Sequence, residues 1–460
     1  MSRPRVSIVT LGCARNDVDS EELQVRLRDQ GFDIGGDDDE ADVVLVNTCG
    51  FIAAAKKDSI DTVLDLADGA APVVVTGCLA ERYGAELAES LPEAAAVLGF
   101  DDYPEIADRL RRVMAGETLA AHEPRDRRRL LPLSPVERGS ASVVTPGHGA
   151  GIVRREVTGP SMPVKLASGC DRRCSFCAIP TFRGSFVSRP PQDIIDEVVH
   201  LADGGAREVV LVSENSTSYG KDLGDLRLLE ALLPRIAAVP GIARVRVNYL
   251  QPAEMRPGLV RAIAETDGVA AYFDLSFQHA SATVLRRMRR FGGTTDFLAL
   301  LDGIRSASPG AGVRSNVIVG FPGETEDDVE ELVAFLSEAR LDGIGVFGYS
   351  AEDGTEAAGL PGHLDDAEIS ARVAQVSSVA DEVVWQRAEE RVGEVLEVLV
   401  EEVADGPRTA TGTVTGRAEH QGPEDTETVV EGAAADVRPG EVVRVRVVGT
   451  QGPDLVAVPA

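Results

Sequence analysis

Length, composition and charge already restrict what this chain can be. Its 460 residues exceed one ordinary domain core, so two or three domains are expected. The hydrophobic share of 43% is close to that of globular proteins, and no apolar run approaches the roughly 18 residues of a membrane span. The formal net charge of −29 argues against general nucleic-acid binding, which relies on dense Lys and Arg that contact phosphates.

The N-terminus and the cysteines agree on the cellular compartment. The opening stretch "MSRPRVSIVT" enters a strand-like pattern without the apolar region of a signal peptide, so a cytoplasmic protein with no membrane association is expected. Scattered thiols in a reducing compartment indicate metal or redox chemistry rather than disulfides. The six cysteines are Cys13, Cys49, Cys78, Cys170, Cys174 and Cys177.

The first hundred residues alternate short apolar runs with helical patterns. Strands are expected at "RVSIVTLGC", "DVVLVNTCG" and "APVVVTGCL", and helices at Asp19–Gln30, at Ala53–Ala67 and after the third strand. Continuous Val, Leu and Ile runs between helices are typical of a parallel sheet that is covered on both faces. The first domain, placed at residues 4–115, is therefore predicted to be an open parallel α/β sheet.

Three cysteines follow the ends of these strands. Cys13, Cys49 and Cys78 each fall one or two residues past a predicted strand. Neighbouring strands lie about 4.8 Å apart, and open α/β sheets bind ligands at the carboxyl ends of their strands. A single buried cysteine is usually structural, but the same position three times over indicates a ligand-binding group.

A second α/β region follows a stretch rich in Arg, Pro, Gly and Ser, residues 116–161, which is predicted to be a linker. Six strand-like runs then recur between helix-forming stretches: "VKLASG", "EVVLVS", "RVRVNYL", "AYFDLSF", "VRSNVIVG" and "GIGVFGYS". Six βα repeats indicate a partial barrel, with the active site at the carboxyl ends of its strands. A long helix over Asp365–Arg391 closes this domain, placed at residues 162–391.

The tail, residues 392–460, alternates apolar and polar residues between Gly, Pro and Asp turns. This pattern is typical of a small antiparallel β-barrel. From Arg391 to Ala460 there are 6 Arg and no Lys against 13 Asp and Glu, a net charge of −7. Such a barrel should repel tRNA phosphates and attract a basic protein, although an acidic proteome would give the same count.

The stretch "KLASGCDRRCSFCAIP", Lys165 to Pro180, carries Cys170, Cys174 and Cys177 in a CxxxCxxC spacing at the end of the first predicted barrel strand. Three thiolates cannot close a four-ligand zinc site, and His200, the nearest histidine downstream, has no ligand-like spacing. A 4Fe-4S cluster held by three cysteines leaves one iron open. An iron–sulfur cluster is therefore favoured over zinc.

With Phe176 before its last cysteine, this motif resembles that of the radical SAM superfamily. The resemblance implies that the open iron binds the amino and carboxylate groups of S-adenosylmethionine. It also implies that the reduced cluster cleaves this molecule to methionine and a deoxyadenosyl radical, which removes hydrogen from an unactivated carbon. The expected cofactor-binding residues are Phe176, Ser213, Glu214, Asn215, Gln278, Asn316 and Gly320.

Each of these strand-end groups has a structural alternative. The polar run Ser213–Asn215 can cap the next segment. The glycines of "VIVGFPGET" suit an ordinary strand-to-helix turn. Gln278 and His279, in "LSFQHAS", can simply form hydrogen bonds with neighbouring loops.

The chain as a whole resembles the methylthiotransferase family of radical SAM enzymes. "LGCARNDVDSE", "VNTCGF" and "VTGCLAERY" match its N-terminal domain in order, and the tail resembles the TRAM barrel. The resemblance implies a second 4Fe-4S cluster on Cys13, Cys49 and Cys78, again with one open iron. There, sulfur would be methylated by one S-adenosylmethionine and delivered to a carbon radical made with a second one.

Two stretches, "LGCARNDVDSEEL" and "FGYSAEDGTEAAGL", are similar to the branch of the family that modifies an aspartate of small-subunit ribosomal protein S-twelve. The other branch modifies an adenosine of tRNA, and it differs at Ala14 and across Ala351–Gly354. "RGSFVSRP" and the Glu of "SENSTSYG" depart from the forms expected for the first branch. The family also implies a reductant such as flavodoxin or ferredoxin.

Three other functions stay open at this point. A tRNA methylthiotransferase would modify adenosine rather than a protein. A non-catalytic iron–sulfur electron carrier would bind iron without cleaving S-adenosylmethionine. An RNA-binding module would use the barrel, which the acidic tail disfavours. No heptad run is visible, so a monomer is expected.

Overall fold

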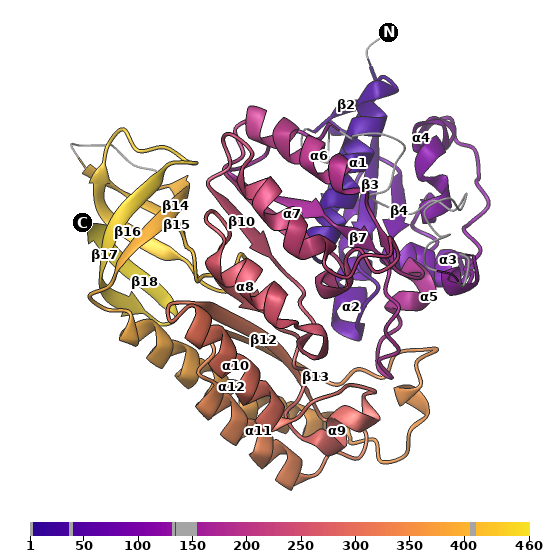
Figure 1. Ribbon diagram of the computed structural model, residues 1–460. Coiled ribbons are helices and arrows are strands. Elements are labelled where there is room, and N and C mark those ends of the chain that lie inside the picture. The colour runs from indigo at the N-terminus through magenta and orange to yellow at the C-terminus, as the bar shows by residue number, and fades with distance from the viewer. Residues whose placement is uncertain (1–2, 36–39, 131–133, 135–153, 405–410) are drawn as a thin grey trace.

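Three sheet systems follow one another along the chain in the computed structural model (Figure 1). The structure describes residues 3–35, 40–130, 134, 154–404 and 411–460. An open parallel sheet, a curved six-strand parallel system and a small closed barrel appear in that order, which confirms the predicted fold class. Within the region predicted as a linker, residues 131–133 and 135–153 lie outside the described residues.

The N-terminal sheet is parallel throughout, with the strand order β2-β1-β3-β4-β5. Its strands are β1 (Arg5–Thr10), β2 (Asp33–Ile34), β3 (Val43–Thr48), β4 (Val73–Gly77) and β5 (Ala96–Val97). The three predicted strands are confirmed as β1, β3 and β4. The sequence missed β2 and β5, because strands of two residues carry no periodic signal.

Helices cover both faces of this sheet. They are α1 (Ala14–Asp29), α2 (Ala53–Ala67), α3 (Cys78–Ser90) and α4 (Ile106–Met114), with a 3-10 helix, η2, at Phe100–Glu105. Along β3, Val43 and Leu45 belong to one hydrophobic cluster while Val44 and Val46 belong to the other. Burial of each such side chain stabilises the fold by about 1.5–3 kcal/mol. The apolar runs are therefore continuous because both faces of the sheet are covered, as predicted.

The helix predicted at Asp19–Gln30 begins earlier in the structure. α1 starts at Ala14, directly after Cys13, whose extended backbone forms the N-cap. The first turn holds Arg15, Asn16 and Asp17, which show no apolar periodicity. The start of the helix was therefore not predicted from the sequence.

The central region forms the predicted six-strand partial barrel. In spatial order its parallel strands are β6 (Ser161–Lys165), β9 (Glu208–Val212), β10 (Arg244–Val247), β11 (Tyr272–Asp274), β12 (Gly312–Val319) and β13 (Gly343–Gly348). Two parallel bridges, Val245 to Val269 and Leu250 to Leu275, join the β6-β9-β10 half to the β11-β12-β13 half. Each of the six runs identified in the sequence thus forms a strand.

Helices line the outside of this partial barrel (Figure 1). They are α6 (Pro191–Asp203), α7 (Leu228–Ala237), α8 (Pro257–Glu265), α9 (Ala282–Arg287), α10 (Thr294–Ala307), α11 (Glu326–Ala339) and α12 (Asp366–Glu390). The short helix α5 (Ile179–Arg183) instead packs against the N-terminal domain. The long helix predicted over Asp365–Arg391 is confirmed as α12, with these two residues as its caps. Four 3-10 helices complete the described helices: η3 (Arg127–Arg129), η5 (Ser216–Ser218), η6 (Pro252–Glu254) and η7 (Ala357–Gly359).

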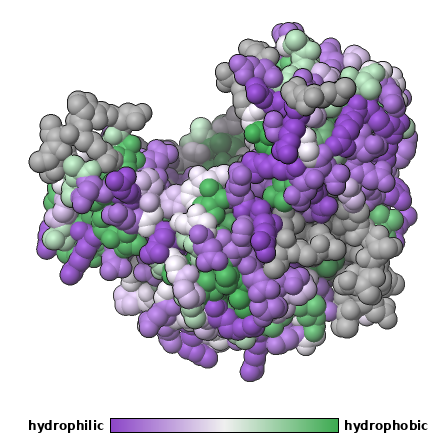
Figure 2. Space-filling view, turned by 90° about the horizontal axis from the view of Figure 1, so that it is seen from above, coloured by the Kyte–Doolittle hydropathy of each residue, from purple (hydrophilic) through white to green (hydrophobic). Residues whose placement is uncertain are grey.

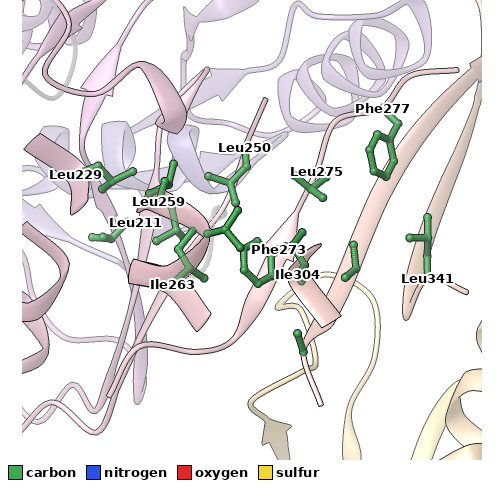
Figure 3. Packing of buried hydrophobic residues seen from close by; sticks show 14 of the residues in the cluster. Leu211, Leu229, Leu250, Leu259, Ile263, Phe273, Leu275, Phe277, Ile304 and Leu341 are labelled. Carbon is green, nitrogen blue, oxygen red and sulfur yellow. The ribbon is translucent and has the colours of Figure 1, made fainter. Parts of the chain in front are cut away.

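One hydrophobic core fills the space between these strands and helices. Figure 3 shows Leu211, Leu250 and Phe273 from the strand side facing Leu259 and Ile263 of α8. All five side chains are buried. The outer surface is different, and hydrophilic residues cover most of the face shown in Figure 2. No helix among the described residues is long and apolar enough to cross a membrane.

The C-terminal barrel closes in the order β14-β15-β16-β18-β17. Its strands are β14 (Val395–Val403), β15 (Thr411–Ala418), β16 (Thr428–Ala434), β17 (Val442–Gln451) and β18 (Asp454–Pro459). One detail of the prediction is wrong, because β16 and β18 run parallel while the other neighbouring pairs are antiparallel. β17 and β18 form a hairpin that carries β18 back to β16 and closes the barrel.

A buried ion pair ties the barrel to the central region. Glu208 Oε1 accepts a hydrogen bond from Arg246 Nε at 2.8 Å, and both side chains are fully buried. Arg246 and Arg244 also donate to main-chain oxygens of the barrel, those of Glu419 and Arg417. Burial alone would raise the pKa of Glu208, but the surrounding arginines hold it below its ordinary value.

Replacing Glu208 by Gln should destabilise the protein near neutral pH, because Arg246 would lose its buried negative partner. A cost of about 3–5 kcal/mol is expected for such a broken pair. Since the pKa of Glu208 is lowered, its stabilisation is present above the ordinary glutamate pKa of about 4.3 and is lost as pH falls through the lowered value. Urea unfolding across this pH range measures the difference.

The matched control is Glu265→Gln, at an exposed position near the end of α8. It should change the free energy of unfolding by no more than about 0.5 kcal/mol at any of these pH values. Equal effects of the two substitutions would contradict a special role for Glu208.

Candidate active site

The N-terminal cysteine group, Cys13, Cys49 and Cys78, lies at the carboxyl edge of the first sheet. Cys13 follows β1 by three residues, Cys49 directly follows β3, and Cys78 is the first residue of α3. β1 and β3 are neighbours, and the strand order reverses between them. Open α/β sheets bind ligands in the crevice at such a reversal, so the cysteines stand at the expected ligand position.

Glycines bring these cysteines together. A Cβ on Gly12, which has a φ of 106°, would lie 2.9 Å from Cys49 Cβ. A Cβ on Gly77, with a φ of 91°, would lie 2.2 Å from Asn47 Oδ1. Only glycine fits both the left-handed backbone and this close approach, so these two residues set the path of the chain next to Cys13 and Cys78.

The loop cysteine group, Cys170, Cys174 and Cys177, lies on an excursion between two short antiparallel strands, β7 (Ala167–Ser168) and β8 (Val187–Ser188). Ser175 anchors this loop to the residues that end α9. Its main-chain N donates to Met288 O at 3.1 Å, and its Oγ donates to Arg287 O at 2.7 Å. The sequence did not reveal β7 and β8, which have two residues each.

The same loop enters the core of the N-terminal domain. Ala178 and Phe182, from α5 and the residue before it, are buried in the cluster formed by one face of the first sheet and its helices. A segment that begins in the barrel is therefore packed as part of the neighbouring domain. This packing fixes the loop cysteine group relative to the N-terminal one.

Arg15 lies between the two cysteine groups. Its Nε is 3.4 Å from Cys13 Sγ, and its Nη1 donates to Ser213 O, at the end of β9, at 3.3 Å. The guanidinium stands 4.7 Å from the centre of the Tyr249 ring. Burial, together with Cys174, raises the pKa of the Cys177 thiol to about 12, and the charge of Arg15 acts against this rise. Arg15 therefore interacts with a cysteine of each group.

Arg183, the last residue of α5, makes a second connection. Its Nη2 donates to Cys78 Sγ at 3.1 Å and to Asn16 Oδ1 at 2.7 Å. Its Nη1 donates to Asp19 Oδ2 at 2.8 Å, and its Nε lies 4.0 Å from Glu214 Oε1. A buried guanidinium from the barrel thus contacts a thiol of the N-terminal group and faces a carboxylate at the end of β9.

The three polar residues predicted after β9 separate into two kinds. Ser213 Oγ accepts from Asn215 N at 3.2 Å, and the Asn215 amide donates to Ser218 and Glu254. These two side chains hold the loop after β9 and attach it to Glu254 of η6, which is the structural alternative. Glu214 instead points toward Arg183 and keeps one buried oxygen, Oε2, without a hydrogen-bond partner among the described residues.

The other predicted contacts also differ from one another. Gln278 adopts a φ of 71°, a left-handed conformation that is strained for this residue. His279 is fully buried, accepts from Ser281 N at 3.0 Å and lies 3.4 Å from Glu324 Oε2, so it is held inside the protein. Phe176 is half-buried and packs against the central core.

Asn316 and Gly320 lie on and after β12. Asn316 Oδ1 is buried and has no hydrogen-bond partner among the described residues. Gly320 has a φ of 78°, and a Cβ there would lie 2.7 Å from Ile369 of α12. The close approach of α12 therefore gives a packing reason for this glycine.

Buried polar atoms without partners gather at three barrel strands. They are Glu214 Oε2 after β9, Asn248 Oδ1 after β10 and Asn316 Oδ1 on β12. Such atoms are costly unless a ligand completes their hydrogen bonds. A ligand with amino and hydroxyl donors fits them, and S-adenosylmethionine carries both.

The thiols themselves fit a metal cluster. Burial raises the pKa of Cys49, and raises that of Cys78 to about 11. Such thiols become thiolates when a metal binds them. Among the described residues, no group of three or more His, Cys, Asp and Glu side chains has the geometry to hold a single metal ion. A cluster does not need that geometry, because each thiolate binds a different iron.

Three segments match known families. Residues 5–99 match the family described as Uncharacterized protein family UPF0004, residues 164–336 match the Radical SAM superfamily, and residues 392–459 match the TRAM domain. Each segment falls in a different sheet system of the structure, and the Radical SAM match ends before β13.

Whole-length relatives are more specific. The chain is 61% identical to the "Ribosomal protein uS12 methylthiotransferase RimO" of Saccharopolyspora erythraea, across 100% of this chain and 96% of that protein. It is 63% identical to the protein of the same name from Nocardioides sp., across 99% of this chain and 97% of the relative. The chain belongs to the RimO methylthiotransferase family.

A third member of the RimO family, from Streptomyces coelicolor, is 57% identical across 99% of this chain and 96% of its own length. Membership confirms the resemblance to methylthiotransferases and the choice of branch made from the sequence. It also makes this chain an enzyme that transfers sulfur-containing groups. The radical SAM segment implies one 4Fe-4S cluster and S-adenosylmethionine.

Solved structures agree with the RimO family on the fold. The radical S-adenosylmethionine methyltransferase TsrM from Kitasatospora setae, with cobalamin and a [4Fe-4S] cluster bound, matches with a TM-score of 0.53. The match has 16% sequence identity and covers 76% of this chain and 72% of TsrM. At this identity the likeness supports the architecture alone.

Sequence reasoning missed the cations that separate the two cysteine groups in this RimO-family chain. Arg15 was visible only as part of a cysteine motif, and Arg183 only as part of a stretch that departs from its relatives. Arg15, two residues after Cys13, could have been found as a charged residue in the first turn of a helix that begins at a cysteine. No local pattern identified Arg183.

Replacing Asp19 by Ala should destabilise this RimO-family chain strongly. Asp19 accepts hydrogen bonds from Lys165 and Arg183, and all three side chains are buried. Burial opposes ionisation, yet these two cations hold the pKa of Asp19 below its ordinary value. Loss of one member of a buried ionic cluster costs about 3–5 kcal/mol, which urea unfolding of the metal-free chain measures.

Asp17→Ala is the matched control, because Asp17 lies on the same helix and is exposed. Its effect should stay within about 0.5 kcal/mol. If both variants unfold at the same urea concentration as the unmodified chain, the ionic cluster does not stabilise the contact between the domains.

Proposed function

We propose that this chain is a ribosomal protein uS12 methylthiotransferase, which adds a methylthio group to the β-carbon of an aspartate of that protein. The observation that carries the proposal is its identity of 61% to the Saccharopolyspora erythraea protein of this name over the entire chain. Arg15 lies 3.4 Å from Cys13 and its charge also acts on Cys177, and two cysteine groups linked in this way are in keeping with a reaction that joins sulfur to carbon.

We further propose that each cysteine group holds its own 4Fe-4S cluster. The support is chemical, because each group offers three thiols, and all six cysteines of the chain are then used. When bound, the loop cluster would supply the electron that cleaves S-adenosylmethionine, and the N-terminal cluster would hold the sulfur that is methylated. Two molecules of S-adenosylmethionine would be consumed for each methylthio group.

The chain's own residues prepare this site. Arg15 and Arg183 place positive charge against the cysteines, which favours the thiolate form that a metal requires. The unpartnered oxygen of Glu214 would accept a hydrogen bond from the amino group of S-adenosylmethionine. The unpartnered oxygen of Asn316 would accept a hydrogen bond from a second donor group. The core that surrounds the site keeps water away from a reactive radical.

The proposal also covers the division into domains and the partners. We propose a division into residues 4–115, a linker at 116–161, residues 162–391 and residues 392–460, which the changes of sheet along the chain support. A flavodoxin or ferredoxin as reductant and a monomeric state belong to the same proposal. The net charge of −7 from Arg391 to Ala460, 6 Arg and no Lys against 13 Asp and Glu, supports a basic protein substrate rather than tRNA.

The intact mass of uS12, from cells with and without this gene, tests the substrate. Deletion should make the protein lighter by about 46 Da, the mass of SCH3 in place of H. The tRNA nucleosides of the same cells should stay unchanged. The proposal would be contradicted if deletion left the mass of uS12 unchanged and removed a thiomethylated adenosine from tRNA.

Two cysteine variants test whether the two cysteine groups hold separate clusters with different roles. After anaerobic reconstitution, Cys174→Ala should lose about half of the iron together with cleavage of S-adenosylmethionine. Cys78→Ala should also lose about half of the iron, but it should keep this cleavage and lose only transfer of the methylthio group. Each variant is the control for the other. Loss of all iron, or of none, in either variant would contradict two separate clusters.

A further inference from the structure

A basic cavity opens beside the loop cysteine group. Its volume is about 640 Å³, and it is lined by residues of the loops that follow β6, β9, β10 and β11. Six of its lining residues are Arg or Lys and two are Asp or Glu. The six cations are Arg172, Arg173, Lys221, Arg286, Arg289 and Arg290.

This charge is opposite to that of the chain, whose formal net charge is −29. Two of the cations are neutralised in place, since Arg172 lies 3.4 Å from Glu254 and Arg289 lies 2.6 Å from Glu356. Lys221 and Arg286 are exposed, and within the described ranges neither forms an ion pair. The cavity therefore carries positive charge that is available to a partner.

The cavity is connected directly to the cysteines. Arg172 and Arg173 lie between Cys170 and Cys174 in the chain. Arg290, on the opposite wall, has its Nη1 3.9 Å from Cys174 Sγ. A protein seated at the mouth of the cavity would therefore stand close to whatever metal group these thiols hold.

The rim also carries an apolar anchor. Phe291 lines the cavity, and 74% of its surface is exposed, the largest fraction among the exposed large hydrophobic residues. An exposed aromatic side chain in a cavity lined mainly by cations suits the interface of an acidic protein better than a site for a small anion. A basic substrate protein would be repelled here.

We propose that the basic cavity is the docking site of an acidic one-electron donor protein of the flavodoxin or ferredoxin class. This inference rests on the proposed function, which requires an electron from outside the chain. The donor loses one electron, and the metal group on the loop cysteines gains it, with no bond made or broken. The acidic remainder of the surface repels such a donor and restricts productive contact to the cavity.

The test separates binding from catalysis. The double variant Lys221→Glu with Arg286→Glu reverses two exposed charges of the cavity, one on the loop after β9 and one on α9. The control, Arg261→Glu, reverses an exposed charge of α8 that does not line it. Full-length reconstituted proteins are titrated calorimetrically with a purified bacterial flavodoxin and, separately, a ferredoxin, at low and at high salt.

The Kd for at least one donor should rise about tenfold or more in the double variant and stay unchanged in the control. The difference should shrink at high salt, because exposed charges are screened. Cleavage of S-adenosylmethionine driven by the donor protein should fall in the same proportion. Cleavage driven by dithionite, which needs no docking, should stay at the level of the unmodified protein.

Other outcomes overturn the proposal. If neither donor binds the unmodified protein, the cavity is not their docking site. The same conclusion follows if both donors bind the double variant as tightly as the unmodified protein. A double variant that binds donors normally but loses affinity for ribosomal subunits would assign the cavity to RNA. If dithionite drives no cleavage even in the unmodified protein, the proposed function fails, and the calorimetric result still decides the docking site.

Discussion

The structure depends on one buried ionic cluster, formed by Asp19 of α1 with Lys165 and Arg183 of the central region. Removing such charges from water is costly unless they are paired, so the cluster holds only when both domains are in place. Asp19 lies six residues after Cys13, and Arg183 six residues after Cys177. The cluster therefore joins the segments that carry the two cysteine groups.

A fixed position of the two cysteine groups would matter for the proposed reaction with two clusters. If the domains separated, a radical made at one cluster would meet water or protein before it met the sulfur at the other. Glu352 adds a second tie, because it pairs with Lys56 and Arg82 of the N-terminal domain at 2.7 Å each. Glu352 lies in the stretch that distinguished the two branches of the family, so this stretch also serves to join the domains.

Charge is unevenly distributed over the protein. Acidic residues dominate the chain and its terminal barrel, which favours a basic protein substrate. The cavity beside the loop cysteine group is lined mainly by cations. If both proposals hold, a basic substrate and an acidic electron donor would not compete for one site.

The sequence by itself determined the strands and the positions of the cysteines. Continuous apolar runs, as in β3 and β9, are local signals, and the CxxxCxxC spacing is contained in eight residues. The sequence did not predict the start of α1 or the two-residue strands, because their residues show no hydrophobic periodicity. The parallel pairing of β16 with β18 also escaped, since strand direction is set by the path of the whole barrel.

Only the tertiary structure decided which polar residues belong to the site. Ser213, Glu214 and Asn215 look equivalent in the sequence, yet Ser213 and Asn215 are used in hydrogen bonds that hold the loops, while Glu214 faces Arg183 and keeps one unpartnered oxygen. Arg183 is 105 residues from Cys78 and contacts its sulfur. Such pairs arise from burial between domains, and burial between distant segments leaves no periodic trace in either segment.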